Sequence, residues 1–123
     1  MLASAFGLLC ATVVTGAGLA ILYIKGPRAK PPPGAALVAH AVLGAASLIV
    51  LILALRRGLR QTGMGTAEFG VIAGAALALA LLFGLILAHA SWRGRRPAPI
   101  LVGTHASLAV AGFVLLLTLL ALR

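Results

Sequence analysis

Four long apolar stretches divide the chain, separated by short polar connections. They fall at about residues 3–24, 35–55, 67–89 and 99–121, and the connections between them are rich in Lys, Arg, Pro and Gly. A helix needs roughly 20 consecutive apolar residues to cross the hydrocarbon core of a bilayer. The pattern therefore predicts an all-α integral membrane protein. We expect one domain over residues 1–123, with four transmembrane helices packed as antiparallel neighbours.

Composition supports the same class of protein. The chain is 63% hydrophobic and 9% charged, and Glu68 is its only acidic residue. A soluble domain of 123 residues has too little interior to bury so many apolar side chains. The net charge of +9 does not indicate nucleic acid, because the basic residues lie between the spans and only Trp92 adds an aromatic ring among them. The expected partners are the lipid bilayer and either other membrane subunits or a second copy of the chain.

The basic residues also predict an orientation. The connections after the first and third spans hold six of them: Lys25, Arg28, Lys30, Arg93, Arg95 and Arg96. The opposite side holds four: Arg56, Arg57, Arg60 and Arg123. Because Lys and Arg accumulate on the cytoplasmic side of a membrane, the six-residue side is predicted to be cytoplasmic and both termini to lie outside.

The second and fourth spans share a pattern that indicates an internal repeat of two hairpins. PPPGAALVAHAVLGAAS and RPAPILVGTHASLAVAG each place an apolar run after prolines, followed by His-Ala-x-Leu. His40 and His105 open these tetrapeptides. Each repeat holds two spans, so both repeats enter the membrane from the same side. We therefore expect the two histidines at equal depth, roughly 9 Å below one surface at 1.5 Å per residue.

Each histidine stands above small residues on its own helix face. Four and seven residues after His40 come Gly44 and Ser47, and the same steps from His105 reach Ala109 and Gly112. Steps of four and seven residues keep to one face of a helix. A flat macrocycle between spans two and four needs this arrangement, with one imidazole on each side of the iron and walls without bulky side chains. The propionates of such a macrocycle need cations, and Arg28, Lys30, Arg93 and Arg95 lie at that end.

These features resemble the small helical b-type cytochromes of bacterial membranes. The resemblance covers the two His-Ala-x-Leu segments and the four-span layout. It implies haem b as cofactor, His40 and His105 as axial ligands, electron transfer as the activity and the bacterial inner membrane as the location. The chain departs from that family's tendency to place two ligands on one helix.

Two other interpretations of the histidines stay open. They can be structural, bonded to a backbone carbonyl or a hydroxyl, with the small residues serving only helix packing. They can also bind zinc or copper with His89 as a third imidazole, although no carboxylate is near.

The main alternative for the whole chain is a non-catalytic accessory subunit that packs against a larger membrane complex. Catalysis by the chain itself is not indicated. The sequence has no Asp and no second carboxylate for acid–base work. No Ser or Cys has both a base and an orienting acid available.

Overall fold

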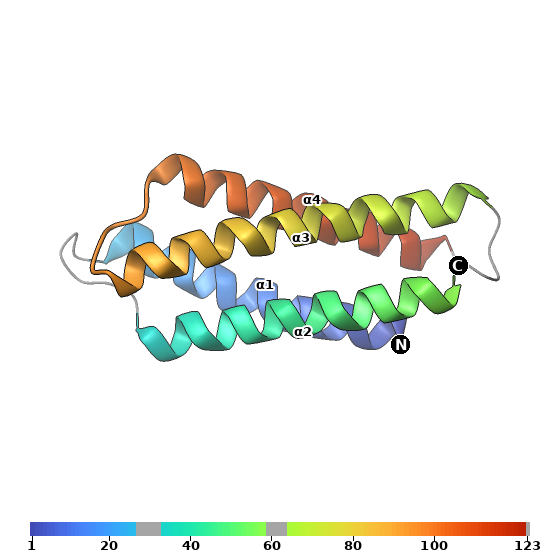
Figure 1. Cartoon of the computed structure of the whole chain (residues 1–123), viewed down its shortest axis with the longest axis horizontal. Helices are drawn as coiled ribbons and strands as arrows, with labels where there is room; N and C mark the ends of the chain where they lie inside the picture. Colours follow the sequence, from blue (N-terminus) through green and yellow to red (C-terminus); the bar gives the residue numbers. More distant parts are fainter. Residues whose placement is uncertain (27–32, 59–63, 123) are drawn as a thin grey trace.

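The computed structural model describes residues 1–26, 33–58 and 64–122, and these form an all-helical bundle. Its four helices are α1 (Leu2–Lys25), α2 (Gly34–Gly58), α3 (Met64–Trp92) and α4 (Pro99–Ala121) (Figure 1). Each helix coincides with one predicted stretch, and the observed ends extend beyond the predicted ones by at most three residues. The predicted all-α class and the four helices are therefore confirmed for the described residues.

Prolines mark where α2 and α4 begin. Pro33 immediately precedes α2, and its carbonyl accepts the amide of Ala36 at 3.0 Å. Pro99 occupies the first turn of α4, after Ala98 in an extended conformation. A proline in the first turn costs no hydrogen bond, because the first amides of a helix have no partner within the helix. The described helices contain no proline beyond their first turn, so each continues for more than 20 residues.

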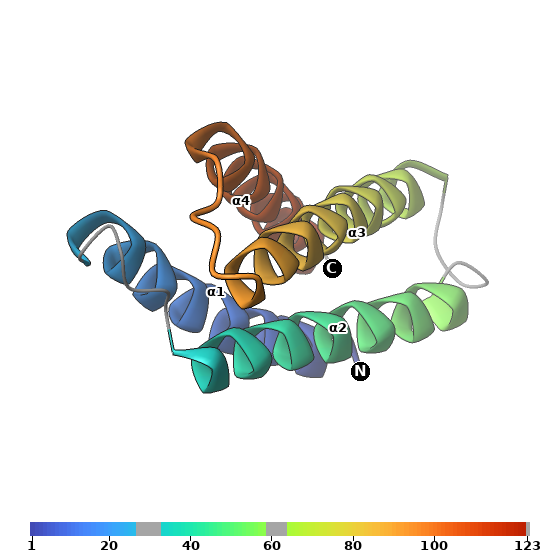
Figure 2. The ribbon, with the colours of Figure 1, turned by 60° about the vertical axis from the view of Figure 1, so that its left-hand side comes forward.

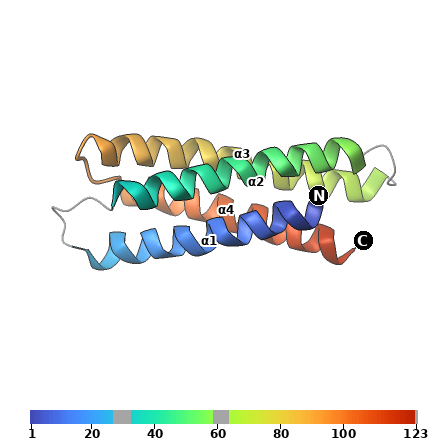
Figure 3. The same cartoon turned by 90° about the horizontal axis from the view of Figure 1, so that it is seen from below.

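The helices pair as two antiparallel hairpins. α1 packs chiefly on α2, and α3 chiefly on α4, while the contacts between the hairpins are fewer (Figure 2). Among the described residues, α2 and α4 do not pack against each other, so these two helices occupy diagonal positions in the bundle. The N-terminus of α1 and the C-terminus of α4 lie at the same end (Figure 3). Both hairpins therefore start from that end, as the two-hairpin pattern predicts.

The end of the bundle that holds the termini is solidly packed. Phe6 of α1 stacks on Phe113 of α4, with ring centroids 5.3 Å apart. Leu55 of α2 lies directly against Gly70 of α3, where a larger residue would have no room. The buried cluster around them is made of apolar residues from all four helices: Leu2, Ala5, Leu9, Leu51, Ala54, Leu55, Ala73, Leu77, Leu116 and Leu119. This half of the bundle fixes the relative positions of the two hairpins.

The outside of the bundle is apolar. Large aliphatic side chains are exposed on every helix, among them Val14, Ile24, Val42, Ile49, Ile72, Leu82, Ile100 and Val110. All four helices are long and apolar enough to cross a membrane. Water-soluble monomers rarely expose a continuous apolar surface of this extent.

Candidate functional site

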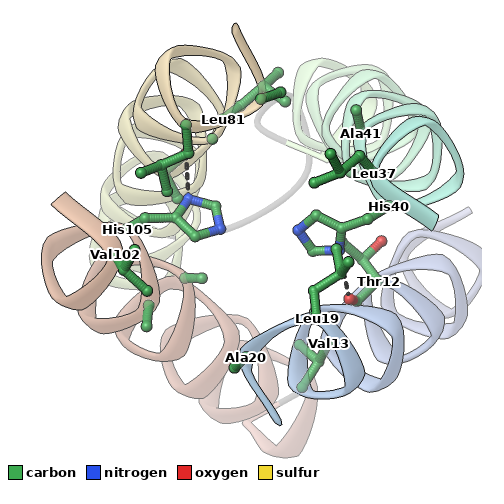
Figure 4. Close-up of a pocket in the computed structure, with 18 of the residues that line it drawn as sticks. Thr12, Val13, Leu19, Ala20, Leu37, His40, Ala41, Leu81, Val102 and His105 are labelled. Carbon is green, nitrogen blue, oxygen red and sulfur yellow. Dashed lines mark hydrogen bonds between the residues drawn. The ribbon is translucent and has the colours of Figure 1, made fainter. Parts of the chain in front are cut away.

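The half of the bundle away from the termini contains a cavity of about 330 Å³ (Figure 4). All four helices line it, so it lies between the two hairpins. Small residues form much of its wall, including Gly16, Gly44, Gly84 and Ala109. Sites for small molecules and cofactors are typically about 300–1,000 Å³, so the cavity is large enough for a guest of that class.

His40 and His105 face each other across this cavity (Figure 4). His40 is six residues after the first residue of α2, and His105 is six residues after the first residue of α4. The two histidines thus have the same register on diagonal helices, as the repeat predicts. Their ring centroids are 6.0 Å apart, and the ring planes make an angle of 78°.

Both imidazoles are oriented by a backbone carbonyl on the preceding helix. Nδ1 of His40 is 3.0 Å from the carbonyl oxygen of Thr12, and Nδ1 of His105 is 2.7 Å from that of Ala80. A carbonyl can only accept, so Nδ1 carries the proton in each ring and the Nε2 of a neutral imidazole keeps a free lone pair. In the described part of the chain no hydrogen bond involves either Nε2. Two nitrogen donors are therefore available to a guest in the cavity.

Thr15 adds a contact that only His40 has. Its Oγ1 lies 3.2 Å from Nδ1 of His40 and 2.9 Å from the carbonyl oxygen of Thr12. The hydroxyl can donate to the carbonyl of Thr12 or to that of Ala11, 3.0 Å away, so its oxygen is also available to accept from the Nδ1–H of His40. The carbonyl contacts match the structural interpretation of the histidines, but they involve only Nδ1 and leave Nε2 unexplained.

A glycine lies against each imidazole, four residues after the carbonyl that the imidazole contacts. A Cβ built on Gly16 would be 2.8 Å from Cε1 of His40, and one on Gly84 would be 3.0 Å from Cε1 of His105. A side chain at position 16 would therefore require the His40 ring to shift, and one at position 84 would press the His105 ring aside by a few tenths of an ångström. The sequence alone does not indicate that these glycines meet the histidines. In both hairpins the glycine comes four residues after the residue whose carbonyl accepts the hydrogen bond. This spacing points to a histidine contact only when it is known that α1 packs on α2 and α3 on α4.

Three of the four small residues predicted to lie below the histidines do line the cavity: Gly44, Ser47 and Ala109. Gly112 does not. A Cβ built there would be 2.6 Å from Cγ of Leu77, so Gly112 belongs to the solidly packed half. Gly112, seven residues after His105, therefore lies below the end of the cavity.

Neither the predicted third ligand nor any described predicted cation is part of the cavity wall. Arg93 is exposed and does not line the cavity, and Arg28 and Lys30 lie outside the described residues. His89 is exposed on α3 and is not part of the cavity wall. Among residues 1–26, 33–58 and 64–122, no group of three His, Cys, Asp or Glu side chains is arranged to hold a metal ion. The structure thus brings His40 and His105 together without His89.

A contact links α1 to the α3–α4 connection at the histidine end. Tyr23 lines the cavity, and its hydroxyl donates to the carbonyl of Pro97 at 3.0 Å. Nη2 of Arg96 donates to the carbonyl of Tyr23 at 3.0 Å, with the guanidinium carbon 4.7 Å from the centroid of the tyrosine ring. Stacking of Arg on an aromatic ring adds to the hydrogen bond. From the sequence, Arg96 is only one of the basic residues at this end and Tyr23 is not predicted as a site residue.

The chemistry available here is coordination by two opposed imidazoles in a mostly apolar cavity. Metal-ligating histidines typically donate the N–H of their other ring nitrogen to a carbonyl or carboxylate, and both histidines make such a hydrogen bond here.

No protein-family model, curated protein or solved structure matches this chain at a significant level.

Proposed function

We propose that this is an integral membrane protein that binds haem b between α2 and α4 and transfers electrons. His40 and His105 are the axial ligands in this proposal. The observation that carries it is the pair of imidazoles, each held through Nδ1 by a carbonyl, with Nε2 facing a cavity of about 330 Å³. The membrane location is supported by the apolar exterior and by four helices of spanning length.

The distance between the rings supports a metal bound by both. Two imidazoles on opposite sides of one metal have ring centroids about 6.3 Å apart, since each metal–nitrogen bond is about 2.0 Å. The observed separation is 6.0 Å. The observed separation therefore supports a single metal held by both imidazoles.

The number of ligands supports a macrocycle over a bare ion. Zinc in proteins takes four ligands, and the described residues gather no third His, Cys, Asp or Glu around the cavity. A haem supplies four equatorial nitrogens itself, so the protein needs to add only two. A bare ion on two imidazoles would also leave most of the 330 Å³ cavity unexplained. The glycine and alanine walls leave space where a flat ring would lie.

The chain's own residues would control such a cofactor in three ways. A bound haem b supplies one-electron redox chemistry, and histidine in both axial positions leaves no open position for oxygen. The carbonyls of Thr12 and Ala80 hold each imidazole in the tautomer that can bind iron. Leucine, alanine and valine side chains around the histidines keep water away from the site.

Basic residues at the histidine end are suited to the propionates. Lys25, Arg93, Arg95 and Arg96 are exposed at that end, and Arg28 is proposed to join them. Guanidinium groups bind carboxylates with strong, charge-assisted hydrogen bonds. The same charges favour a cytoplasmic histidine end and termini outside, in a bacterial inner membrane, within the proposed topology.

Absorption spectroscopy of the protein purified in detergent tests the proposal. Wild type is expected to show a haem Soret band and visible bands that sharpen on reduction. His40→Ala and His105→Ala are each expected to lose the low-spin spectrum, while His89→Ala keeps it because His89 lies outside the cavity. A colourless wild-type protein that co-purifies with fixed partners would instead support the accessory-subunit alternative. Metal without porphyrin, lost in His89→Ala, would support the zinc or copper site.

A further inference from the structure

We infer that Gly16 and Gly84 are positioning residues that hold the two axial imidazoles nearly perpendicular to each other. The inference rests on the proposed haem site and adds to it, because it assigns the ring orientation to two glycines on the helices that carry no ligand. The ring planes make an angle of 78°. Both glycines line the cavity, and each lies nearest to its own imidazole, through which it acts in this proposal.

Two contacts restrain each ring, and the hydroxyl of Thr15 adds a third for His40. The Nδ1–H of His40 bonds to the carbonyl of Thr12 at 3.0 Å, and Cε1 lies above Gly16, where an added Cβ would be 2.8 Å away. Rotation of the ring about its bond to a metal would move Nδ1 away from the carbonyl and Cε1 across the glycine. The hydrogen bond and the glycine contact therefore select the same rotation.

The second hairpin repeats this arrangement. His105 Nδ1 is 2.7 Å from the carbonyl of Ala80, and a Cβ on Gly84 would be 3.0 Å from Cε1. Ala80 and Gly84 have the same spacing of four residues as Thr12 and Gly16, one helical turn apart on one face. Each ring is thus oriented by the first helix of its own hairpin. The angle between the rings is therefore set by the rotation of one hairpin relative to the other.

The angle has an electronic consequence for a bound haem. Each imidazole donates π density to the iron d orbital that lies perpendicular to the ring plane. Parallel rings act on the same orbital and separate the two dπ levels, whereas perpendicular rings act on both levels almost equally. Ligand orientation is thus one of the means by which a protein tunes a haem. At 78° the oxidised low-spin iron is expected to give an electron paramagnetic resonance signal dominated by a single large g value.

Glycine-to-alanine variants of the haem-loaded protein test the role of these residues. Gly16→Ala and Gly84→Ala are each expected to shift the dominant g value downward and to produce three well-separated g values, with the low-spin absorption spectrum retained. Gly18→Ala on α1 and Gly103→Ala on α4 are matched controls, because a Cβ at either position meets nothing within 4 Å. Wild-type g values in both Gly16→Ala and Gly84→Ala would overturn the inference, as would an equal change in the controls.

Chemical rescue provides a second test that does not depend on alanine being tolerated. In His40→Gly, free imidazole can bind the iron and still donate its N–H to the carbonyl of Thr12. The large-g signal is expected to return with imidazole but not with 1-methylimidazole, which has no N–H. Identical signals with the two ligands would show that the carbonyl of Thr12 does not select the ring rotation, and would overturn the claim that the hydrogen bond and the glycine contact act together.

Failure of this inference is distinct from failure of the proposed function. A wild-type protein with a bis-histidine haem spectrum but three well-separated g values would refute the perpendicular rings alone. A wild-type protein without any haem spectrum would refute the haem site, and the positioning role with it.

Discussion

Filling the cavity should separate cofactor binding from bundle stability. Ala109 of α4 lines the cavity one turn after His105, so a leucine at this position would project into the space between the hairpins. Leucine exceeds alanine by roughly 80 Å³, about a quarter of the 330 Å³ cavity. At about 24 cal/mol per Å³ of cavity filled, the haem-free bundle should gain ~2 kcal/mol. The same side chain would occupy the space proposed for the macrocycle, so haem binding should be lost.

Two assays on the same samples measure the two effects. Unfolding of haem-free protein by a denaturing detergent, followed by circular dichroism, gives the change in the free energy of unfolding. Titration with haem, followed at the Soret band, gives the binding affinity. Ala111→Leu is the matched control, because Ala111 is exposed on the same helix and does not line the cavity. It should change stability by less than about 0.5 kcal/mol and leave haem affinity unchanged.

The reasoning would be refuted if Ala109→Leu bound haem with wild-type affinity. It would also be refuted if Ala109→Leu lost haem and destabilised the haem-free bundle by as much as it was expected to stabilise it. In that case the space beside Ala109 would not accept a side chain, and the loss of haem would report only damaged packing.

Two further predictions concern the ends of the bundle. Leu116→Ala, at a position only 1% exposed in the solidly packed half, should lower the free energy of unfolding by about 2–4 kcal/mol and leave the haem spectrum unchanged; a changed spectrum would show that the two halves are not independent. Tyr23→Phe removes the hydroxyl that donates to Pro97 and should cost about 1 kcal/mol of stability. Because this contact joins α1 to the α3–α4 connection beside the cavity, Tyr23→Phe should also release haem to an acceptor protein faster than wild type, and an unchanged release rate would contradict that role.

The helices and the histidine pair were predictable because they depend on local patterns. Hydropathy alone locates four spans, and the prolines locate the starts of α2 and α4. The shared His-Ala-x-Leu pattern gives His40 and His105 the same register, and the short connections make each hairpin antiparallel. Because α2 and α4 occupy diagonal positions in the bundle, two residues of equal register on their inner faces lie opposite each other.

The remaining features of the site depend on contacts between residues far apart in the chain. Gly16 meets His40 because α1 and α2 pack at a particular rotation, which no periodicity within one helix encodes. Gly112 shares a helix face with His105 yet packs on Leu77, because the cavity ends before the second turn below the histidine. Arg96 and Tyr23 are 73 residues apart in the sequence, and nothing in their residue types predicts the hydrogen bond between them.

X-ray absorption at the iron edge of the purified protein tests the central claim most directly, because it reports the ligands of the metal itself. The account predicts six nitrogen ligands at about 2.0 Å, with the scattering pattern of two imidazoles in wild type and of one in His40→Ala or His105→Ala. Iron with fewer than two imidazoles in wild type, or a protein that binds no iron, would contradict it.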